Sequence, residues 1–134
     1  MTSKLLKQSF MKTRLLYILL LSPLSLFAQE FVNSNTFDAK VSKGIVVVEF
    51  WAEWNKSNEV PFLGELKDCV SYKLSIVGNS SIQKQFNVTS VPTLIILNNG
   101  IEEKRFNSNI MMQLNATKKD VQSTVDEITF NKFQ

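Results

Sequence analysis

One stretch, "IVVVEFWA" from Ile45 to Ala52, constrains the fold more than any other part of the sequence. It is an almost unbroken apolar run, rich in β-branched residues, and Gly44 precedes it as a helix-breaking residue. A strand with one face in water alternates apolar and polar residues, whereas a continuous apolar run is typical of a strand buried on both faces. The chain is therefore expected to contain a parallel or mixed sheet with helices on its faces.

Three further strands are expected. Residues 69–77, "CVSYKLSIV", alternate with period two, and residues 93–97, "TLIIL", form a second buried run. The "NNG" at 98–100 predicts a tight turn between antiparallel strands. After this turn we expect one long, half-exposed strand, because apolar or small residues recur at period two, namely Phe106, Ser108, Ile110, Met112 and Leu114.

Helices are predicted between these strands. Short ones are expected at 36–41 and 81–86, and another within 59–68, where Pro61 and Gly64 weaken it. A T-x-x-D capping pattern opens a closing helix whose apolar stripe is Val121, Val125, Ile128 and Phe133. Strands and helices in this order predict a single α/β domain with a mixed central sheet flanked by helices.

Residues 1–28 have the composition of an export signal. From Met11 to Ala28 the chain has two basic residues, an apolar run and a small final residue. We expect cleavage before Gln29, with residues 29–134 as the mature domain in a periplasmic or secreted location, and Met11 is a possible alternative start. A membrane anchor is the alternative, although the apolar run is shorter than the roughly 20 residues of a spanning helix.

The export segment also accounts for the basic character of the whole chain. Four of the 15 Lys and Arg residues and none of the 12 acidic ones lie in 1–28, so residues 29–134 carry 11 basic and 12 acidic residues. Their net charge is −1, which argues against nucleic acid as a partner. Contact with a membrane is expected only through the export signal.

The reactive residues of the chain are few. It has one cysteine, Cys69, and no histidine, so it can form no internal disulfide and no Ser-His-Asp or Cys-His catalytic group. One cysteine without histidine also leaves no recognisable zinc site, and no cofactor is expected. Cys69 is expected to be a small buried or edge residue; an intermolecular disulfide is the alternative.

Two strings carry a resemblance to a known family. "VVVEFWAEW" is similar to the central strand of the thioredoxin fold, together with the tryptophan that precedes the family's Cys-x-x-Cys. "VTSVPTLIILNNG" is similar to the family's cis-proline loop and the strand and hairpin turn after it. The resemblance covers nearly all of residues 30–130 and implies a thioredoxin-like three-layer α/β fold.

The resemblance assigns a role to each matching position. Asn55 and Asn58 occupy the positions of the two cysteines, and Lys56 and Ser57 lie between them. Disulfide exchange needs a thiolate and a second, resolving thiol, and asparagine supplies neither. The usual reaction is therefore not expected at this site.

A buried charged pair is also implied. Glu49 matches the family's buried acid, and Lys73 its buried lysine. A carboxylate in a covered strand is costly to ionise unless it is paired, so a structural Glu49–Lys73 pair is expected. Glu49 as a general base in another reaction is the alternative.

The resemblance further implies a peptide-binding groove. Pro92 matches the cis-proline, Val91 the residue whose backbone pairs with bound polypeptide, and Trp54 the exposed tryptophan beside the groove. The first hypothesis is thus an exported, redox-inactive domain that binds a protein or an extended peptide here. One alternative is an oxidoreductase that acts through Cys69 or through thiols of a partner. Another is a scaffold whose contacts lie on the strand expected from Phe106 to Leu114.

Overall fold

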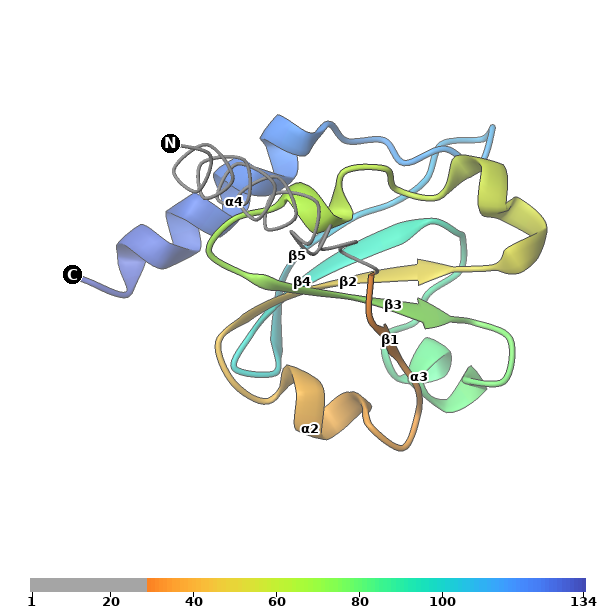
Figure 1. Ribbon diagram of the computed structural model, residues 1–134, viewed down its shortest axis with the longest axis horizontal. Helices are drawn as coiled ribbons and strands as arrows, with labels where there is room; N and C mark the ends of the chain where they lie inside the picture. Colours follow the sequence, from red (N-terminus) through yellow and green to blue (C-terminus); the bar gives the residue numbers. More distant parts are fainter. Residues whose placement is uncertain (1–28) are drawn as a thin grey trace, which may run out of the picture.

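The computed structural model describes residues 29–134, so the export segment predicted at 1–28 lies outside the described residues (Figure 1). The strands are β1 (Phe31–Val32), β2 (Ile45–Trp51), β3 (Val70–Ser75), β4 (Thr93–Asn98) and β5 (Ile101–Phe106). The α-helices are α2 (Phe37–Val41), α3 (Ser80–Gln85) and α4 (Lys118–Asn131), and two 3₁₀ helices are η1 (Glu53–Asn58) and η2 (Leu63–Glu65). Sequence patterns had not indicated β1, because two residues are too few to show a period.

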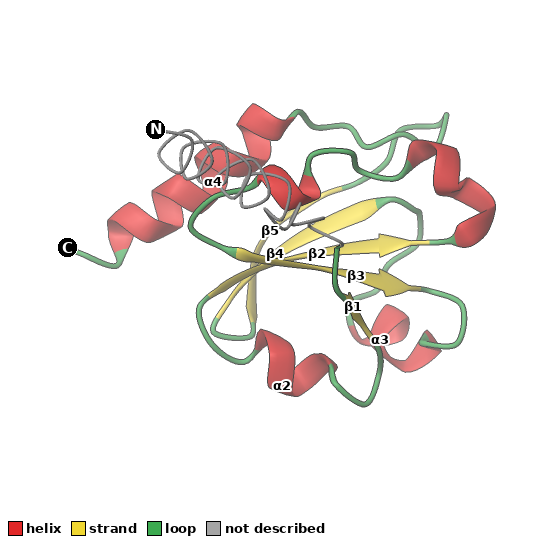
Figure 2. Cartoon of the chain, viewed as in Figure 1, coloured by secondary structure: helices red, strands yellow, loops and turns green. Residues whose placement is uncertain are grey.

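The five strands form one mixed sheet in the order β1-β3-β2-β4-β5. β3 runs parallel to both β1 and β2, whereas β4 is antiparallel to β2 and to β5. Helices α2 and α3 cover one face of the sheet, and η2 and α4 lie on the other (Figure 2). The mixed sheet flanked by helices that the sequence predicted is thus confirmed.

Strand β2 lies at the centre, and all seven of its residues are buried. Alternate side chains enter two separate apolar clusters. Val46, Val48 and Phe50 pack with residues of α2 and α3, whereas Ile45 and Val47 pack with residues of α4 and η2. Burial on both faces explains why this strand shows no polar alternation.

The helix expected within 59–68 does not form; only the three residues of η2 are helical there. The segment must return along β2 to the start of β3. Seven strand residues span about 23 Å, whereas eleven residues in an α-helix advance only about 16 Å. A short connection therefore has to be more extended than an α-helix, and Pro61 and Gly64 weaken a helix further.

The long strand expected from Phe106 to Leu114 is also wrong, because β5 ends at Phe106. Residues 107–116, called the strap from here on, fold back as a small hairpin. The Asn115 N–H donates to the Asn107 carbonyl over 3.0 Å, and the Asn109 N–H to the Gln113 carbonyl over 2.8 Å.

The side chain of Asn109 explains this turn. Its Oδ1 accepts from the backbone N–H groups of Met111 and Gln113, which is the turn-forming behaviour typical of asparagine. Met112 adopts a left-handed φ of 58°. The period-two pattern of the strap therefore comes from a turn and not from a strand.

The closing helix α4 begins as its capping pattern predicted. Thr117 accepts from the Asp120 N–H, while the Asp120 carboxylate accepts from the Thr117 N–H. Val121 and Val125 are fully buried and Ile128 packs beside them, but Phe133 lies beyond the helix and is 86% exposed, so its predicted place in the stripe is wrong. Within residues 29–134, no helix has the length and apolar character needed to cross a bilayer.

Candidate functional site: the Asn55 corner

The C-terminal end of β2 and the start of β4 lie side by side at the same end of the sheet. β2 and β4 are antiparallel, with Phe50 opposite Thr93. The chain therefore leaves β2 for η1 close to where Val91 and Pro92 lead into β4. The Val91–Pro92 peptide bond is cis, and both residues are buried. Two segments far apart in sequence thus form a corner.

Asn55 lies at the centre of this corner. Its Nδ2 donates to the Val91 carbonyl over 3.1 Å and to the Met112 carbonyl over 3.0 Å, and its Oδ1 accepts from Asn58 Nδ2 over 2.9 Å. The side chain is only 9% exposed, and these bonds satisfy both of its amide hydrogens. The Val91 carbonyl, one part of the backbone that the resemblance had assigned to bound polypeptide, is therefore engaged within the chain.

The exposed rim of the corner is formed by η1. Trp54 is 61% exposed, although it is a large apolar residue, and Lys56 and Ser57 are exposed after it. A cavity of about 70 Å³ lies beneath Trp54. Its lining residues are Trp54, Ile76, Gln83, Thr89, Ser90, Val91 and Met112.

A larger hollow lies on the opposite side of the strap. It has a volume of about 340 Å³ and separates strap residues Gln113, Leu114 and Ala116 from residues 57–62. Met112 is meanwhile part of the wall of the smaller cavity under Trp54. Different residues of the strap therefore line two separate cavities.

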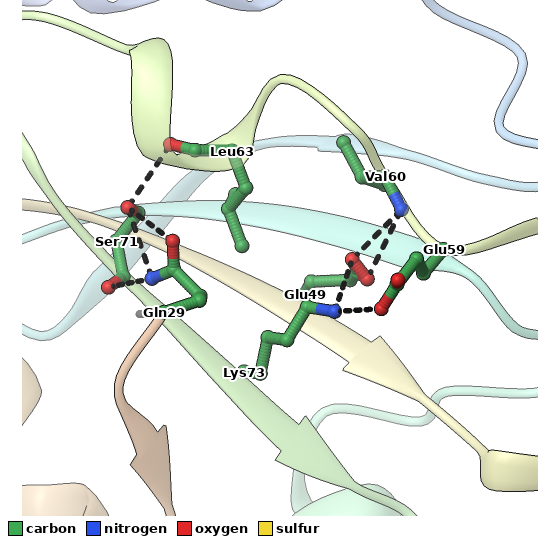
Figure 3. A network of polar contacts seen from close by, with 7 residues as sticks. All are labelled: Gln29, Glu49, Glu59, Val60, Leu63, Ser71 and Lys73. Carbon is green, nitrogen blue, oxygen red and sulfur yellow. Dashed lines mark hydrogen bonds and ion pairs between the residues drawn. The ribbon is translucent and has the colours of Figure 1, made fainter. Parts of the chain in front are cut away.

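A second cluster of functional groups lies on the face of the sheet covered by η2 and α4. Glu49 and Lys73 are opposite each other on β2 and β3, and the Lys73 Nζ is 4.0 Å from the Glu49 Oε1. Lys73 also makes a short contact with Glu59 (Figure 3), and its Nζ lies 4.9 Å from the centre of the Trp51 ring. The single positive charge of Lys73 is thus shared between two carboxyl groups.

The carboxyl group of Glu49 is fully buried and accepts the backbone N–H of Val60 over 3.0 Å. Burial raises its pKa to about 7, against the lowering effects of Lys73 and of the Val60 N–H; Glu59 adds a further increase. The group is therefore able to hold or release a proton near neutral pH. No thiol stands at the Asn55 and Asn58 positions to exchange that proton.

An open cavity of about 370 Å³ adjoins this cluster. Gln29, Glu59, Gly64 and Lys73 are among its lining residues. The Gln29 amide donates to both the carbonyl and the hydroxyl of Ser71, whose hydroxyl also donates to the Leu63 carbonyl (Figure 3). Most of the residues that line the cavity belong to the segment 59–68, for which the sequence predicted a helix.

Sequence reasoning missed three residues of these sites: Glu59, Gln29 and Met112. Glu59 had one usable signal, since it is an acid next to the polar break at Asn58 and close to the apolar Val60. Gln29 and Met112 had none, because a glutamine after a signal segment and a methionine in an alternating run point to no contact in particular.

Cys69 lies away from the corner. It precedes Val70, which pairs with Val46 near the start of β2, whereas Asn55 follows the other end of that strand. Burial raises the pKa of its thiol to about 11, and Asp68 and Asp126 contribute to the increase. A thiol with such a pKa is a poor nucleophile.

The arrangement limits the chemistry of the site. The corner holds side-chain amides, backbone carbonyls and one exposed aromatic ring, and none of these groups undergoes thiol–disulfide exchange. Among residues 29–134, no three His, Cys, Asp or Glu side chains gather in a way that could hold a metal ion.

Comparison with known proteins agrees with the fold. The family model described as Thioredoxin matches residues 28–126. The chain is 33% identical to the thioredoxin of Chlamydia pneumoniae over 82 residues, which cover 57% of this chain and 80% of that protein. It is 35% identical to the thioredoxin of Bacillus subtilis over 75 residues, which cover 51% of this chain and 72% of that protein. With its α/β sheet and with asparagines where the family has its cysteine pair, the chain belongs to the thioredoxin family.

Proposed function

We propose that the chain is an exported, redox-inactive thioredoxin-family domain that binds polypeptide at the Asn55 corner. The observation that carries the proposal is Trp54, which is 61% exposed directly over a cavity that the buried Val91 helps to line. Exposed aromatic residues beside a pocket are typical anchors of protein recognition. The asparagines at positions 55 and 58 leave the corner able to form hydrogen bonds but not disulfides.

Site-specific crosslinking tests this function. A photoreactive benzoylphenylalanine is placed at position 54, and the probe is reduced, carboxymethylated insulin B chain, which is unfolded and has no free thiol. We expect light-dependent crosslinking that saturates with probe concentration. Unlabelled probe is expected to compete for the same site.

A matched variant carries the photoreactive residue at Phe133, which is 86% exposed at the far end of α4. This position is also exposed, but it lies away from the corner. It is therefore expected to crosslink only at the background level. Equal labelling at positions 54 and 133 would mean that the probe attaches through nonspecific apolar contacts. A third variant carries the photoreactive residue at position 110, in the strap. Labelling of this variant and not of the variant at position 54 would favour the scaffold alternative.

Export is part of the same proposal. Its support is the composition of residues 1–28, together with the bonds that Gln29 makes to Ser71 at the start of the described domain. Expression of the full chain in a bacterium and N-terminal sequencing of the product should identify Gln29 as the first residue. A product that keeps residues 1–28 and stays with the membrane would support the anchor alternative.

A further inference from the structure

The strap lies across the proposed binding site. The Met112 carbonyl accepts from Asn55, and Met112 is one of the residues that line the cavity beside Trp54. The same Asn55 amide holds the Val91 carbonyl, so one side chain joins the strap to the residue before the cis-proline. A short segment of the chain thus takes contacts that a bound peptide would otherwise make.

The geometry of the strap suggests a separable element. Its internal bonds, from Asn107 to Asn115 and around Asn109, close the hairpin on itself. Its tip is exposed to solvent: Ile110 is 101% exposed and Met111 is 69% exposed. Leu114 and Ala116, at its C-terminal end, pack against the apolar cluster of η2 and α4 and fix that end, so the part that can move is the hairpin tip around Met112. Asn55 is its hydrogen-bonded anchor to the corner.

We propose that the strap is an internal occupant of the peptide-binding site and that Asn55 is the latch that holds it there. The inference rests on the binding function proposed above. An external ligand binds when the strap lifts, which frees the Asn55 amide and opens the space between the two hollows. The site is therefore autoinhibited in the free protein.

The strap also indicates the chemistry of the ligand. Met112, which is 37% exposed, lines the cavity together with Trp54 and Val91, and its backbone carbonyl accepts from the amide of Asn55. A ligand that replaces it would be an extended polypeptide segment with an unbranched apolar residue at that position. An acidic or highly charged peptide does not fit, because the cavity is lined mainly by apolar and uncharged groups.

The first test uses the free protein and needs no ligand. Hydrogen–deuterium exchange is followed in residues 107–116 of the wild type and of Asn55→Ala. Loss of the latch should accelerate exchange of the strap amides at least tenfold, because an isolated two-stranded hairpin is only marginally stable in water and the bonds of the Met112 and Gln113 amides to Asn109 then open more often. Asn115→Ala is the matched control, since it truncates an exposed strap asparagine whose backbone N–H makes the bond to Asn107. It is expected to change exchange less than threefold.

The second test supplies the strap in trans. The probe is a fluorescein-labelled peptide with the sequence of residues 107–116, and its binding is measured by fluorescence anisotropy. We expect a chain that lacks the hairpin tip but keeps Asn55 to bind the probe at least tenfold more tightly than the wild type, whereas Asn55→Ala, which lacks the amide that holds the Met112 carbonyl, should not gain this affinity. In the probe, Met112→Ala should weaken binding about tenfold, whereas Ile110→Ala should not, because Ile110 is fully exposed.

A second variant separates release of the strap from two other effects of Asn55→Ala. These are a folding defect and the loss of the contact that Asn55 makes to the ligand. Residues 109–113 are replaced by two glycines as a turn between the bridged Ser108 and Leu114, which removes the hairpin tip with Met112 and keeps Asn55 and the packed Leu114. The near-ultraviolet circular dichroism of both variants is compared with that of the wild type. Binding of the probe by this chain, but weakly by the wild type, supports the proposal.

The outcomes separate the latch from the binding function. Unchanged exchange in Asn55→Ala, or equal probe affinity in all folded chains, overturns the latch even if Trp54 crosslinks to the insulin B chain. Absence of that crosslink in the wild type and in both variants overturns the binding function and, with it, the strap as an inhibitor.

Discussion

At the scale of single residues, the polar groups of this chain have partners different from those that the family resemblance implied. Lys73 was expected beside Glu49, yet its shorter contact is with Glu59. The resemblance gave Asn55 only the position of a family cysteine and no partner, yet its side chain is buried and bonds to Val91, Met112 and Asn58. In both cases a nearby loop residue, unforeseen from sequence, takes part of the hydrogen bonding.

The buried carboxyl of Glu49 makes the stability of the domain depend on pH. Its pKa is about 7 in the folded protein, above the ordinary value of 4.5 that applies to the unfolded chain. Between these values the folded state holds a proton that the unfolded state has released. The stability contribution is therefore fully present below about pH 4.5 and is lost as the pH rises through about 7.

We expect Glu49→Gln to remove this loss. The difference between the two pKa values corresponds to about 3 kcal/mol at most, so the variant should gain up to this amount of unfolding free energy over wild type at pH 8.5 and little at pH 4.5. Urea unfolding at both pH values measures it. Glu65→Gln, which alters an exposed acid on the same face, is the control and should show no such gain. Parallel pH profiles for wild type and Glu49→Gln would contradict the raised pKa.

At the scale of elements, local capping and connection length explain which predictions held. The start of α4 was predictable because its capping box is a local pattern of four residues. The segment after η1 was not, because its conformation depends on the distance that it must cover back to β3. The strap was misread because its alternation was not tied to any strand partner.

The capping box of α4 is expected to contribute measurably to stability. Thr117→Ala removes the side chain that accepts the Asp120 N–H over 3.2 Å, and it should lower the free energy of unfolding by about 1 kcal/mol. Chemical denaturation measures the change. Ser123→Ala, at an exposed position inside α4, is the control and should have no effect or stabilise slightly. An equal loss in both variants would show that the cap contributes nothing specific.

At the scale of the whole molecule, the number of cysteines limits the redox chemistry of the domain. The single one, Cys69, lies directly before β3. Dithiol–disulfide exchange needs two thiols, and the chain has only Cys69. With a pKa of about 11, on the order of one molecule in 10⁴ carries the thiolate at pH 7. The scaffold of the family is thus present without its usual reaction.

An insulin-reduction assay with dithiothreitol examines this directly. The chain is expected to reduce insulin no faster than dithiothreitol alone, and Cys69→Ser should behave like the wild type. The thioredoxin of Bacillus subtilis, run in parallel, is the positive control. Turnover that disappears in Cys69→Ser would restore the oxidoreductase alternative.

The sequence by itself determined the central strand, the second buried strand, the closing helix and the absence of a cysteine pair, because each is written in adjacent residues or in composition. The family resemblance placed Glu49, Lys73, Trp54, Val91 and Pro92. Only the tertiary structure decided that Glu59 shares Lys73, that the chain after η1 stays extended, and that the strap meets Asn55. These contacts join segments 14 to 57 residues apart, and their geometry follows from how the sheet brings the segments together, which no local pattern records.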